Sequence, residues 1–577
     1  EAVSRRPVPV VSHEVGQYAV YPDMREIDKY RGTLRPINFE AIRRDLERKD
    51  MLGDADKFTR GSGMLALQLY RDEVEAALRT PGMGGFQLLD LHDFPGQSTA
   101  TVGILNSFWE SKGLIGPAEF RRFCGPTVLL LEMPKRLYDA GERWEADVLV
   151  SHYGPADLDG VDIEWSIARA DGSVLARGVL AGVRVPAGTV TRCGGAASGA
   201  FRSLSAAEQL RVTVRIVGTD MVNAWDVWVY PPAESGEQKA EAIAGSPSSA
   251  NAASGEDGIL VAEAWSPEVE RHLARGGRVL LLPFGRNLAN ARPGKFFPVF
   301  WSPVHFKTEN PCGIYVRHAH PLFEGFPTDD YASYQWKDLL EQSVSLNYDS
   351  IGAGLEPLVQ VIPNFYHNHR WTNLFECRAG RGKLVVCSID VSRRLEERGP
   401  ARQLRRSILE YMALDAFNPA TELSFEQLRE LLREDEEAIA KADRPVGREL
   451  AIGRPATASS VKSAEYAAGK GNDGIGHTMW LAADEQPGHW WQVDLGKTYE
   501  LTGTIVKFPQ EANYLYVIQV SGDGQDWRVA VNQTGQTDTS QVRVDLFSER
   551  GRYVKIVYNG LPNGISAGHM KLEVYGK

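Results

Sequence analysis

The chain is poor in the residues that mark several common classes of protein. Its 577 residues include five cysteines, which are scattered and never spaced as Cys-x-x-Cys. This argues against a disulfide framework and against a cysteine-rich zinc site. No apolar run reaches about 18 residues, so the sequence predicts no membrane span. No long run of Lys or Arg occurs and the net charge is −11, which argues against a nucleic-acid-binding protein.

The first 125 residues show the order strand, helices, strand, helix. The stretch "VPVVSHE" predicts a buried strand, and two helical patterns separate it from a second apolar stretch, "GGFQLLDLHDFPGQ". Both predicted strands end in polar residues. This order is typical of an α/β domain with parallel strands.

The rest of the chain predicts four further segments. A Ser/Ala/Gly-rich stretch after the first β-region reads as a flexible linker, and Ser424 with Gln427 predicts a capped helix start. In order, the segments are an immunoglobulin-like β-sandwich (126–232), a small open α/β domain (233–420), a helical linker (421–446) and a second all-β domain (447–577).

Candidate catalytic residues follow the two N-terminal strands. In parallel α/β barrels, active-site residues sit just past the C-terminal ends of strands. Glu14 and the group Asp90, His92 and Asp93 occupy such places. Composition alone favours a plainer interpretation, in which Glu14 is a solvated or salt-bridged residue and the residues from Asp93 onward form a turn.

The two strand motifs carry a family resemblance. "PVVSHEVGQ" followed by "GGFQLLDLHDFPGQ" resembles the last two strands of the catalytic barrel in glycoside hydrolase family 2, the β-galactosidase and β-glucuronidase family. A β-sandwich follows the barrel in that family, as one does here. The resemblance therefore covers residues 1 to about 230. It implies that Glu14 is the nucleophile of a retaining exo-β-glycosidase, which forms a glycosyl-enzyme.

The resemblance also implies roles for the residues around Glu14. Donors such as His13, Gln17 and Tyr18 would hold that carboxylate in its charged form. Three further residues would line the sugar pocket. They are Asp90, His92 and Asp93. The chain departs from the family's pattern at Val15 and Leu89, where aromatic residues are usual.

One part of the glycosidase machinery is not found in the sequence. Retaining hydrolysis needs a second carboxylate about 5–5.5 Å from the first. In the family it follows an Asn, and no Asn-Glu pair occurs here. A whole (β/α)8 barrel takes about 250 residues, whereas only about half that number precede the β-sandwich in this chain. We therefore expect residues 1–125 to be the C-terminal part of a (β/α)8 barrel, with the acid/base upstream of Glu1, and the chain alone to be inactive.

The middle α/β domain resembles the flavodoxin-type, glutamine-amidotransferase-like domain found in several sugar hydrolases. Cys312 and Cys387 are candidate thiol nucleophiles, but neither lies in a Gly-x-Cys-x-Gly turn, which favours a structural domain. The stretch "NFYHNHRW" (364–371) is rich in His and aromatic residues. It is either a metal or sugar site or, as we expect, a packed loop.

The last domain resembles the discoidin fold of carbohydrate-binding module family 32, through "NDGIGHTMW", "PGHWWQVDLG", "VSGDGQDW" and "KLEVYG". The resemblance implies a structural Ca²⁺ held by Asp473 and Glu573, since oxygen ligands suit that ion. We assign Trp490 and Trp491 to the core. The candidate sugar-binding residues on exposed loops are His477, Trp480, Asn513 and Tyr514.

Two functions follow from these resemblances. The first is a retaining exo-β-glycosidase that acts on terminal sugars, with β-galactosides of a poly- or oligosaccharide as the expected substrate and no cofactor for catalysis. The alternative is a non-catalytic carbohydrate-binding protein that uses the discoidin-like domain. A periplasmic or secreted location follows from the family resemblance, and the oligomeric state stays open.

Overall fold

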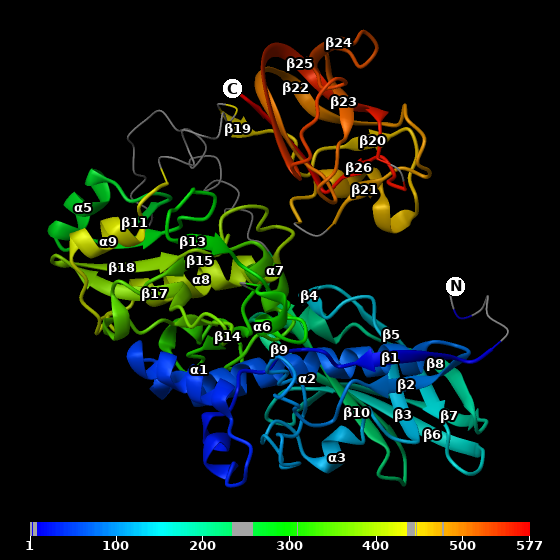
Figure 1. Cartoon of the computed structure of the whole chain (residues 1–577). Coiled ribbons are helices and arrows are strands. Elements are labelled where there is room, and N and C mark those ends of the chain that lie inside the picture. The colour runs from blue at the N-terminus through cyan, green and yellow to red at the C-terminus, as the bar shows by residue number, and fades with distance from the viewer. Residues whose placement is uncertain are drawn as a thin grey trace. The chain divides into compact units, whose positions relative to one another are not determined.

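The structure, a computed structural model, describes residue 3 and residues 8–232, 258–308, 310–435, 445, 447–475, 478–562 and 564–577. The chain divides into two compact units (Figure 1). Unit 1 is formed by Glu1–Arg286 and Asn290–Arg433, and unit 2 by Asn287–Ala289 and Glu434–Lys577.

Unit 1 begins with two parallel strands, β1 (Val10–Val15) and β2 (Met83–Leu88), that lie side by side. They are joined through helices α1 (Ile37–Arg48) and α2 (Ala55–Arg79), and α2 packs against both strands (Figure 1). The N-terminal strand–helix–strand order is therefore present. This sheet has two strands in the described part of the chain, so it is not a closed eight-stranded barrel.

A β-sandwich follows in unit 1, and its two sheets enclose one core. One sheet has the order β3-β5-β8 and the other β4-β10-β9-β6-β7. Trp144 and Trp165 meet in the core with ring centroids 5.5 Å apart. The strands are β3 (Thr127–Glu132), β4 (Leu137–Asp139), β5 (Trp144–His152), β6 (Leu158–Ala168), β7 (Val174–Val185), β8 (Thr189–Ser198), β9 (Glu208–Ile216) and β10 (Val222–Tyr230).

The α/β part of unit 1 has a mixed sheet in place of the expected flavodoxin-type parallel sheet. Strands β11, β12 and β18 are parallel, whereas β13 to β17 pair antiparallel. The cause is local, because β17 returns to β18 through a tight hairpin at Gly380 and not through a crossover helix. The strands are β11 (Ile259–Ala262), β12 (Arg278–Leu281), β13 (Ala291–Pro293), β14 (Gly313–Val316), β15 (Val344–Asn347), β16 (Val359–Ile362), β17 (Trp371–Ala379) and β18 (Gly382–Cys387).

Short helices cover this mixed sheet. The last of them begins with the predicted capping box, since the Ser424 side chain accepts from the Gln427 N–H and the Gln427 side chain from the Ser424 N–H. Residues 436–444 of the predicted linker helix lie outside the described residues. The helices are α5 (Pro267–Ala274), α6 (Pro303–Phe306), α7 (Trp336–Glu341), α8 (Gly399–Ala413) and α9 (Phe425–Leu431); α3 (Pro117–Phe120) lies earlier in the chain.

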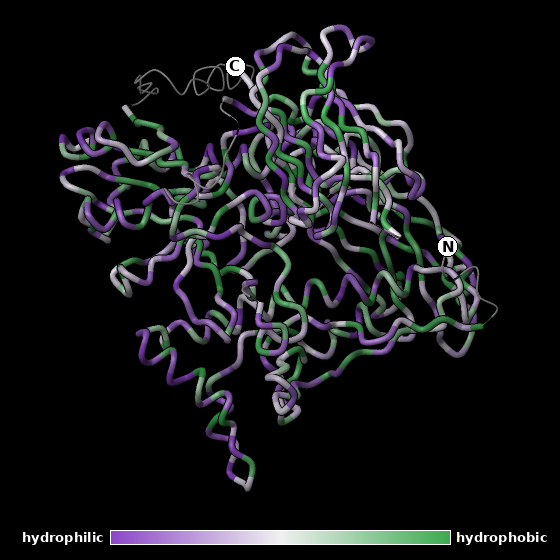
Figure 2. Tube along the Cα trace, turned by 45° about the horizontal axis from the view of Figure 1, so that its top comes forward, coloured by the Kyte–Doolittle hydropathy of each residue, from purple (hydrophilic) through white to green (hydrophobic). Residues whose placement is uncertain are grey.

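Unit 2 is an all-β domain. Its main sheet has the order β19-β27-β22-β25-β23-β24, with β20 beside β22, and β21 pairs with β26. Hydrophilic and hydrophobic residues alternate along its strands, as the colours of Figure 2 show. The strands are β19 (Arg448–Glu449), β20 (Ala456–Ala458), β21 (Trp480–Leu481), β22 (Trp490–Lys507), β23 (Leu515–Ser521), β24 (Arg528–Asn532), β25 (Val542–Gly560), β26 (Gly568–His569) and β27 (Lys571–Gly576).

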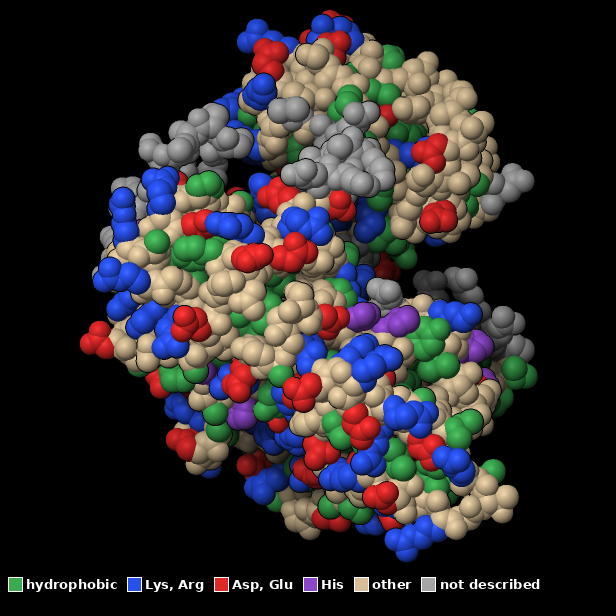
Figure 3. Space-filling view, turned by 60° about the vertical axis from the view of Figure 1, so that its left-hand side comes forward, with side chains coloured by type: hydrophobic (Ala, Val, Ile, Leu, Met, Phe, Trp, Pro, Cys, Tyr) green, Lys and Arg blue, Asp and Glu red, His purple; other side chains and the backbone are tan. Residues whose placement is uncertain are grey.

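Charges of both signs lie on the face of the molecule that Figure 3 shows. On the face shown in Figure 3, Lys and Arg side chains are interspersed with Asp and Glu side chains. Such mixing is typical of a solvated protein surface. Since the whole chain carries a net charge of −11, a functional site is better sought in individual clusters of side chains than in a broad field of one sign.

Candidate functional site

The C-terminal ends of β1 and β2 bring Glu14 and Asp90 to the same edge of their sheet. The two strands are parallel, with Val15 opposite Leu88, and the Leu89 N–H donates to the Val15 carbonyl. Glu14 precedes Val15 and Asp90 follows Leu89. Glu14 and Asp90, which the sequence predicts to share an active site, therefore lie at the same edge of the sheet.

Glu14 is held in an unusual backbone conformation. Its φ is +56°, in the left-handed region that non-glycine residues seldom adopt. The carboxylate is 45% exposed, and its oxygens lie 3.4 Å from His13 Nε2 and 3.4 Å from Gln17 Nε2. His13 and Gln17 thus surround the carboxylate as expected, and solvent can reach it.

Tyr18 does not contact this carboxylate. Its hydroxyl donates to Glu73 Oε1 at 2.6 Å, and the Gly16 N–H donates to the other oxygen of Glu73 at 2.8 Å. Burial and this carboxylate raise the pKa of Tyr18. Gly16 is required here, because a Cβ atom would lie 2.2 Å from the ring of Tyr70. The expectation that Tyr18 supports Glu14 is corrected: Tyr18 fastens the chain after β1 to α2.

Asp90 and His92 form a pair with an exposed indole beside it. His92 Nδ1 lies 2.8 Å from Asp90 Oδ1. The His92 ring packs on Trp109 with centroids 4.4 Å apart, and Trp109 is 62% exposed. A carboxylate, an imidazole and a flat aromatic face are therefore accessible together.

Asp93 is buried and belongs to the interior. Lys112 Nζ lies 2.7 Å from one oxygen, and the Gly103 N–H donates to the other at 2.8 Å. Both side chains are almost fully buried. The expectation that Asp93 lines a sugar pocket is corrected, because this ion pair holds the loop after β2 in place.

Strained backbone gathers around the same strand edge. Of eight described non-glycine residues with positive φ, five are Glu14, Ser98, Thr99, Trp109 and Trp301. Ser302 donates to the Ser98 carbonyl, and the Trp301 N–H donates to the Gln17 carbonyl at 2.8 Å. Such strain costs about 1–3 kcal/mol per residue and is concentrated at functional sites in proteins. We call Glu14, Asp90, His92, Trp109 and Trp301 the strand-end site.

The sequence prediction missed the two indoles of this site. Trp109 follows β2 by some twenty residues, and Trp301 comes from the distant α/β part. Nothing local in the sequence brings Trp301 to Gln17, since the contact depends on tertiary pairing of Tyr18 with Phe300.

Glu26 is buried close enough to Asp93 to feel its charge, and its burial gives a testable pH dependence. Desolvation, with a further contribution from the Asp93 carboxylate, raises the pKa of Glu26 from 4.5 to about 7. The folded state therefore binds the proton of Glu26 more tightly than the unfolded state does. This proton stabilises the folded state fully below pH 4.5, and the stabilisation is lost as the pH rises through 7.

We expect the free energy of unfolding to fall by about 2 kcal/mol more in the wild type than in Glu26→Gln between about pH 5 and about pH 7.5. Denaturant unfolding of both proteins at the two pH values measures this difference. Equal pH slopes for the two proteins would contradict the assignment.

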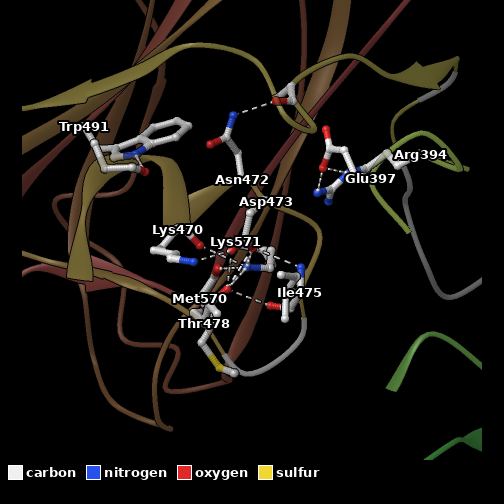
Figure 4. Close-up of polar contacts among 12 residues, drawn as sticks. Arg394, Glu397, Lys470, Asn472, Asp473, Ile475, Thr478, Trp491, Met570 and Lys571 are labelled. Carbon is white, nitrogen blue, oxygen red and sulfur yellow. Dashed lines mark hydrogen bonds and ion pairs between the residues drawn. The ribbon is translucent and has the colours of Figure 1, made fainter. Parts of the chain in front are cut away.

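A lysine occupies the centre of the polar cluster in unit 2 (Figure 4). Lys571 Nζ lies 2.7 Å from Asp473 Oδ1 and 3.1 Å from Thr478 Oγ1. It also donates to the carbonyl oxygens of Lys470 at 3.0 Å and Met570 at 2.7 Å. The ammonium is 11% exposed, and Asp473 is 15% exposed. We call these five residues the lysine cradle.

The cradle does not fit a calcium ion held by Asp473 and Glu573. Burial opposes the charge on Asp473, but the Lys571 ammonium together with hydrogen bonds from Ile475 and Thr478 lowers the pKa of that carboxyl. Glu573 accepts from the Tyr575 hydroxyl at 2.7 Å and lies near Glu449, whose pKa is raised by burial and by this neighbouring charge. Within the described ranges, no group of three or more His, Cys, Asp or Glu side chains is arranged to hold a metal.

Two of the four candidate sugar-binding residues are buried. Trp480 and Tyr514 are fully buried, and Tyr514 stacks on Phe508 with centroids 4.1 Å apart. They cannot offer an exposed platform, so that expectation is corrected. Asn513 is half-buried and accepts from Gln536 at 2.8 Å. His477 lies outside the described residues.

An aromatic and cationic face lies elsewhere on unit 2. Trp491 is buried in the core, as expected, but Trp490 is half-exposed on the opposite face of β22. Lys555 Nζ lies 5.2 Å from the Trp490 ring centroid and 3.6 Å from that of Trp527. Gln492 and Gln519 flank Lys555 on the neighbouring strands. We call Trp490, Lys555 and Trp527 the indole–lysine face.

The other candidate motifs contain buried thiols and a histidine that pairs with a carboxylate. Cys312 and Cys387 are fully buried, and burial raises the pKa of each thiol to about 12, so neither is a thiolate at neutral pH. In the His-rich stretch, His369 Nδ1 lies 2.6 Å from an oxygen of Asp349, and Asn368 is buried.

Among the described residues, no helix is both long and apolar enough to cross a membrane.

Comparison with sequence families matches three parts of the chain. Residues 142–231 match a domain of unknown function (DUF8488), and residues 260–433 match another (DUF8487). Residues 455–570 match the F5/8 type C domain. No curated protein matches the chain.

Several solved structures resemble a small part of the chain. Chitosan-binding module 1 of a chitosanase/glucanase from Paenibacillus sp. IK-5 is 26% identical over 22% of this chain and 99% of its own, with a TM-score of 0.21. CpGH89CBM32-5 from Clostridium perfringens, in complex with GalNAc-β-1,3-galactose, is 24% identical over 22% of this chain and 100% of its own, with a TM-score of 0.20. A protein titled glycoside hydrolase is 22% identical over 23% of this chain and 33% of its own, with a TM-score of 0.19.

The family match and the strand order concern the same part of the molecule. Residues 455–570 include the long strands β22 and β25 and the strands between them, which form most of the main sheet of unit 2. The C-terminal part of this β-rich, multidomain chain is therefore an F5/8 type C, or discoidin-like, domain.

Proposed function

We propose that this protein binds carbohydrate through the indole–lysine face of its F5/8 type C domain. The observation that carries the proposal is the position of Lys555 between two partly exposed indoles. Flat aromatic faces stack on the apolar faces of sugar rings, and nearby amides and ammonium groups bind sugar hydroxyls and acidic substituents. Trp490, Trp527, Gln492 and Gln519 supply these groups on one side of the sheet.

The charge on this face favours an acidic glycan. Lys555 has no carboxylate partner in the part of the chain that the structure describes. Burial lowers the pKa of its ammonium, which shows that the charge is partly desolvated. A carboxylate or sulfate on a bound sugar would supply the missing counter-charge, whereas a protonated amino sugar would be repelled.

The first test is affinity electrophoresis in gels that contain alginate, a neutral β-glucan or chitosan. We expect alginate to retard the protein most, and Trp527→Ala to weaken binding about ten-fold, which is about 1.4 kcal/mol. Trp265→Ala is the matched control, since Trp265 is also partly exposed but lies in unit 1. Equal mobility of the wild type and Trp527→Ala in every gel would overturn the proposal.

The second candidate function is retaining glycoside hydrolysis with Glu14 as nucleophile. The observation that favours it is the gathering of strained residues, the accessible carboxylate of Glu14 and the exposed indole of Trp109 at the strand-end site. An accessible carboxylate at this position could attack an anomeric carbon, while Trp109 and Trp301 contact the sugar ring. The reaction still requires a second carboxylic acid about 5–5.5 Å from Glu14.

Covalent trapping tests this second candidate. A 2-deoxy-2-fluoro glycoside with a good leaving group would label the nucleophile, because the fluorine slows hydrolysis of the glycosyl-enzyme. In a protein that turns aryl glycosides over, we expect peptide mass spectrometry to place the label on Glu14. A label on another residue, or none in a protein that turns the reagent over, would contradict the assignment.

A further inference from the structure

A cavity of about 210 Å³ lies within unit 1, away from the strand-end site. Its wall is formed by α2, by residues 114–123 around α3, by β10 of the sandwich, and by the segment of the α/β part that precedes α7. The lining residues used here are Gln68, Asp72, Arg122, Arg136, Trp228 and Tyr334. A bound water takes about 30 Å³, so the cavity is too large for one bridging water, yet smaller than the pockets of about 300–1,000 Å³ that hold drug-sized ligands.

Three buried polar atoms in the lining of this cavity have no hydrogen-bond partner among the described residues. They are Gln68 Nε2, Trp228 Nε1 and the hydroxyl of Tyr334. Trp228 is 1% exposed, so bulk solvent does not satisfy its N–H. Buried polar groups are nearly always hydrogen-bonded, so three unpaired groups around one space indicate that something polar fills it. An amide N–H, an indole N–H and a hydroxyl together require acceptor oxygens.

The charged groups of the lining favour a negatively charged occupant. The Arg136 guanidinium stacks 4.5 Å above the Tyr334 ring and lies 3.4 Å from the nearest oxygen of Asp72, too long for a strong ion pair. Arg122 is exposed and makes no ion pair with any residue that the structure describes. Two other arginines of the lining are already paired, Arg71 with Glu75 at 2.7 Å and Arg211 with Asp226 at 3.1 Å. Arg122 and Arg136 are therefore the arginines left to meet the charge of a ligand.

We propose that this cavity binds a monosaccharide-sized sugar acid. A carboxylate on the ligand would take the arginine charge, and ring hydroxyls would accept from the Gln68, Trp228 and Tyr334 donors. Asp72 would accept from a further hydroxyl, and the Tyr334 ring would cover one face of the sugar. The site lies in unit 1, so it is separate from the indole–lysine face and does not depend on that proposal.

Calorimetric titration of the full chain with D-glucuronate and with D-glucose tests the proposal. We expect glucuronate to bind at least about ten-fold more tightly than glucose, since glucose lacks the charge that the arginines would pair with. Tyr334→Phe and Gln68→Leu should each weaken glucuronate binding about five-fold, because each removes one donor. Arg122→Gln should weaken the binding of glucuronate and leave that of glucose unchanged.

Controls separate this site from the F5/8 type C domain and from a folding defect. Trp527→Ala should leave the cavity's affinity for glucuronate unchanged, as should Tyr366→Phe, which removes an exposed hydroxyl of unit 1. Thermal unfolding without ligand should be the same for wild type, Tyr334→Phe and Gln68→Leu, whose lost donors have no protein partner. The proposal is overturned if glucuronate does not bind, if glucose binds equally well, or if the cavity variants bind as the wild type does. If neither sugar binds, water alone fills the cavity.

Discussion

Replacing Lys571 by methionine should destabilise unit 2 by about 3 kcal/mol, because breaking a buried pair leaves the partner charge uncompensated. Methionine keeps most of the length of the lysine side chain but removes its charge. The Asp473 carboxylate and the two carbonyl oxygens of the cradle would then face one another without a cation. Denaturant unfolding, followed by a signal that reports on unit 2 alone, measures the loss.

A neighbouring lysine provides the matched control for this substitution. Lys470 Nζ lies 3.7 Å from the other oxygen of Asp473 and is 42% exposed, so its ion pair is weak. Lys470→Met should therefore cost less than about 1 kcal/mol. If the two methionine variants lose the same stability, the cradle is no more than a surface ion pair.

Calcium gives this prediction a second arm. The ammonium occupies the position between the oxygens, so we expect neither Ca²⁺ nor a chelator to change the melting temperature of the wild type. Lys571→Glu would place a carboxylate opposite Asp473, among Thr478 Oγ1 and two carbonyls, which is a ligand set suited to Ca²⁺. That variant should be less stable than the wild type without calcium and should regain stability when calcium is added. If calcium stabilises the wild type, then the Lys571 ammonium does not occupy the place of a calcium ion.

The sequence contained part of this answer. The sequence prediction places Asp473 in a calcium site with Glu573, whereas in the structure Asp473 pairs with Lys571. Both residues lie on the same face of β27, so alternation along the strand does not distinguish them. What distinguishes them is which part of the chain contacts each residue: Lys571 meets Lys470, Asp473 and Thr478.

Alternation along a strand could have corrected one other assignment. Adjacent residues of a strand point to opposite faces, so Trp490 and Trp491 cannot both be core residues. The structure buries Trp491 and leaves Trp490 half-exposed on the face that carries Lys555. Trp527 reaches the same face from the turn after β23, and a single sequence does not reveal that approach.

The N-terminal strands show where prediction from sequence was strong and where it failed. The parallel pairing of β1 with β2, and the placing of Glu14 and Asp90 at one edge, follow from apolar runs that end in polar residues. The burial of Asp93 was not predicted, because it depends on Lys112 reaching back across the loop. The mixed sheet after residue 258 was missed for a similar reason: short apolar strands look alike whether a helix or a hairpin joins them.

The largest expected effect concerns Glu14. If Glu14 is the nucleophile, Glu14→Gln should lower kcat/KM for an aryl glycoside about 10³-fold, which is about 4 kcal/mol of transition-state stabilisation. The matched control is Glu47→Gln, since the Glu47 side chain is 47% exposed and that of Glu14 is 45% exposed, and both side chains lose the same charge. We expect Glu47→Gln to keep full activity. The measurement should be made on this chain, for which we expect no turnover, and on the longest product of its gene.

Rescue by a small nucleophile separates a chemical role of Glu14 from a structural one. In Glu14→Ala, azide can enter the space of the lost carboxylate and attack the anomeric carbon, while the aryloxide leaves with the electron pair of the broken bond. Azide should therefore restore turnover and give a glycosyl azide of inverted configuration. If Glu14 only holds the strained backbone at the end of β1, its loss would lower activity without such rescue. An inactive longest gene product, or a Glu14→Gln variant as active as the wild type, would leave the strand-end site as a binding surface and not a catalytic one.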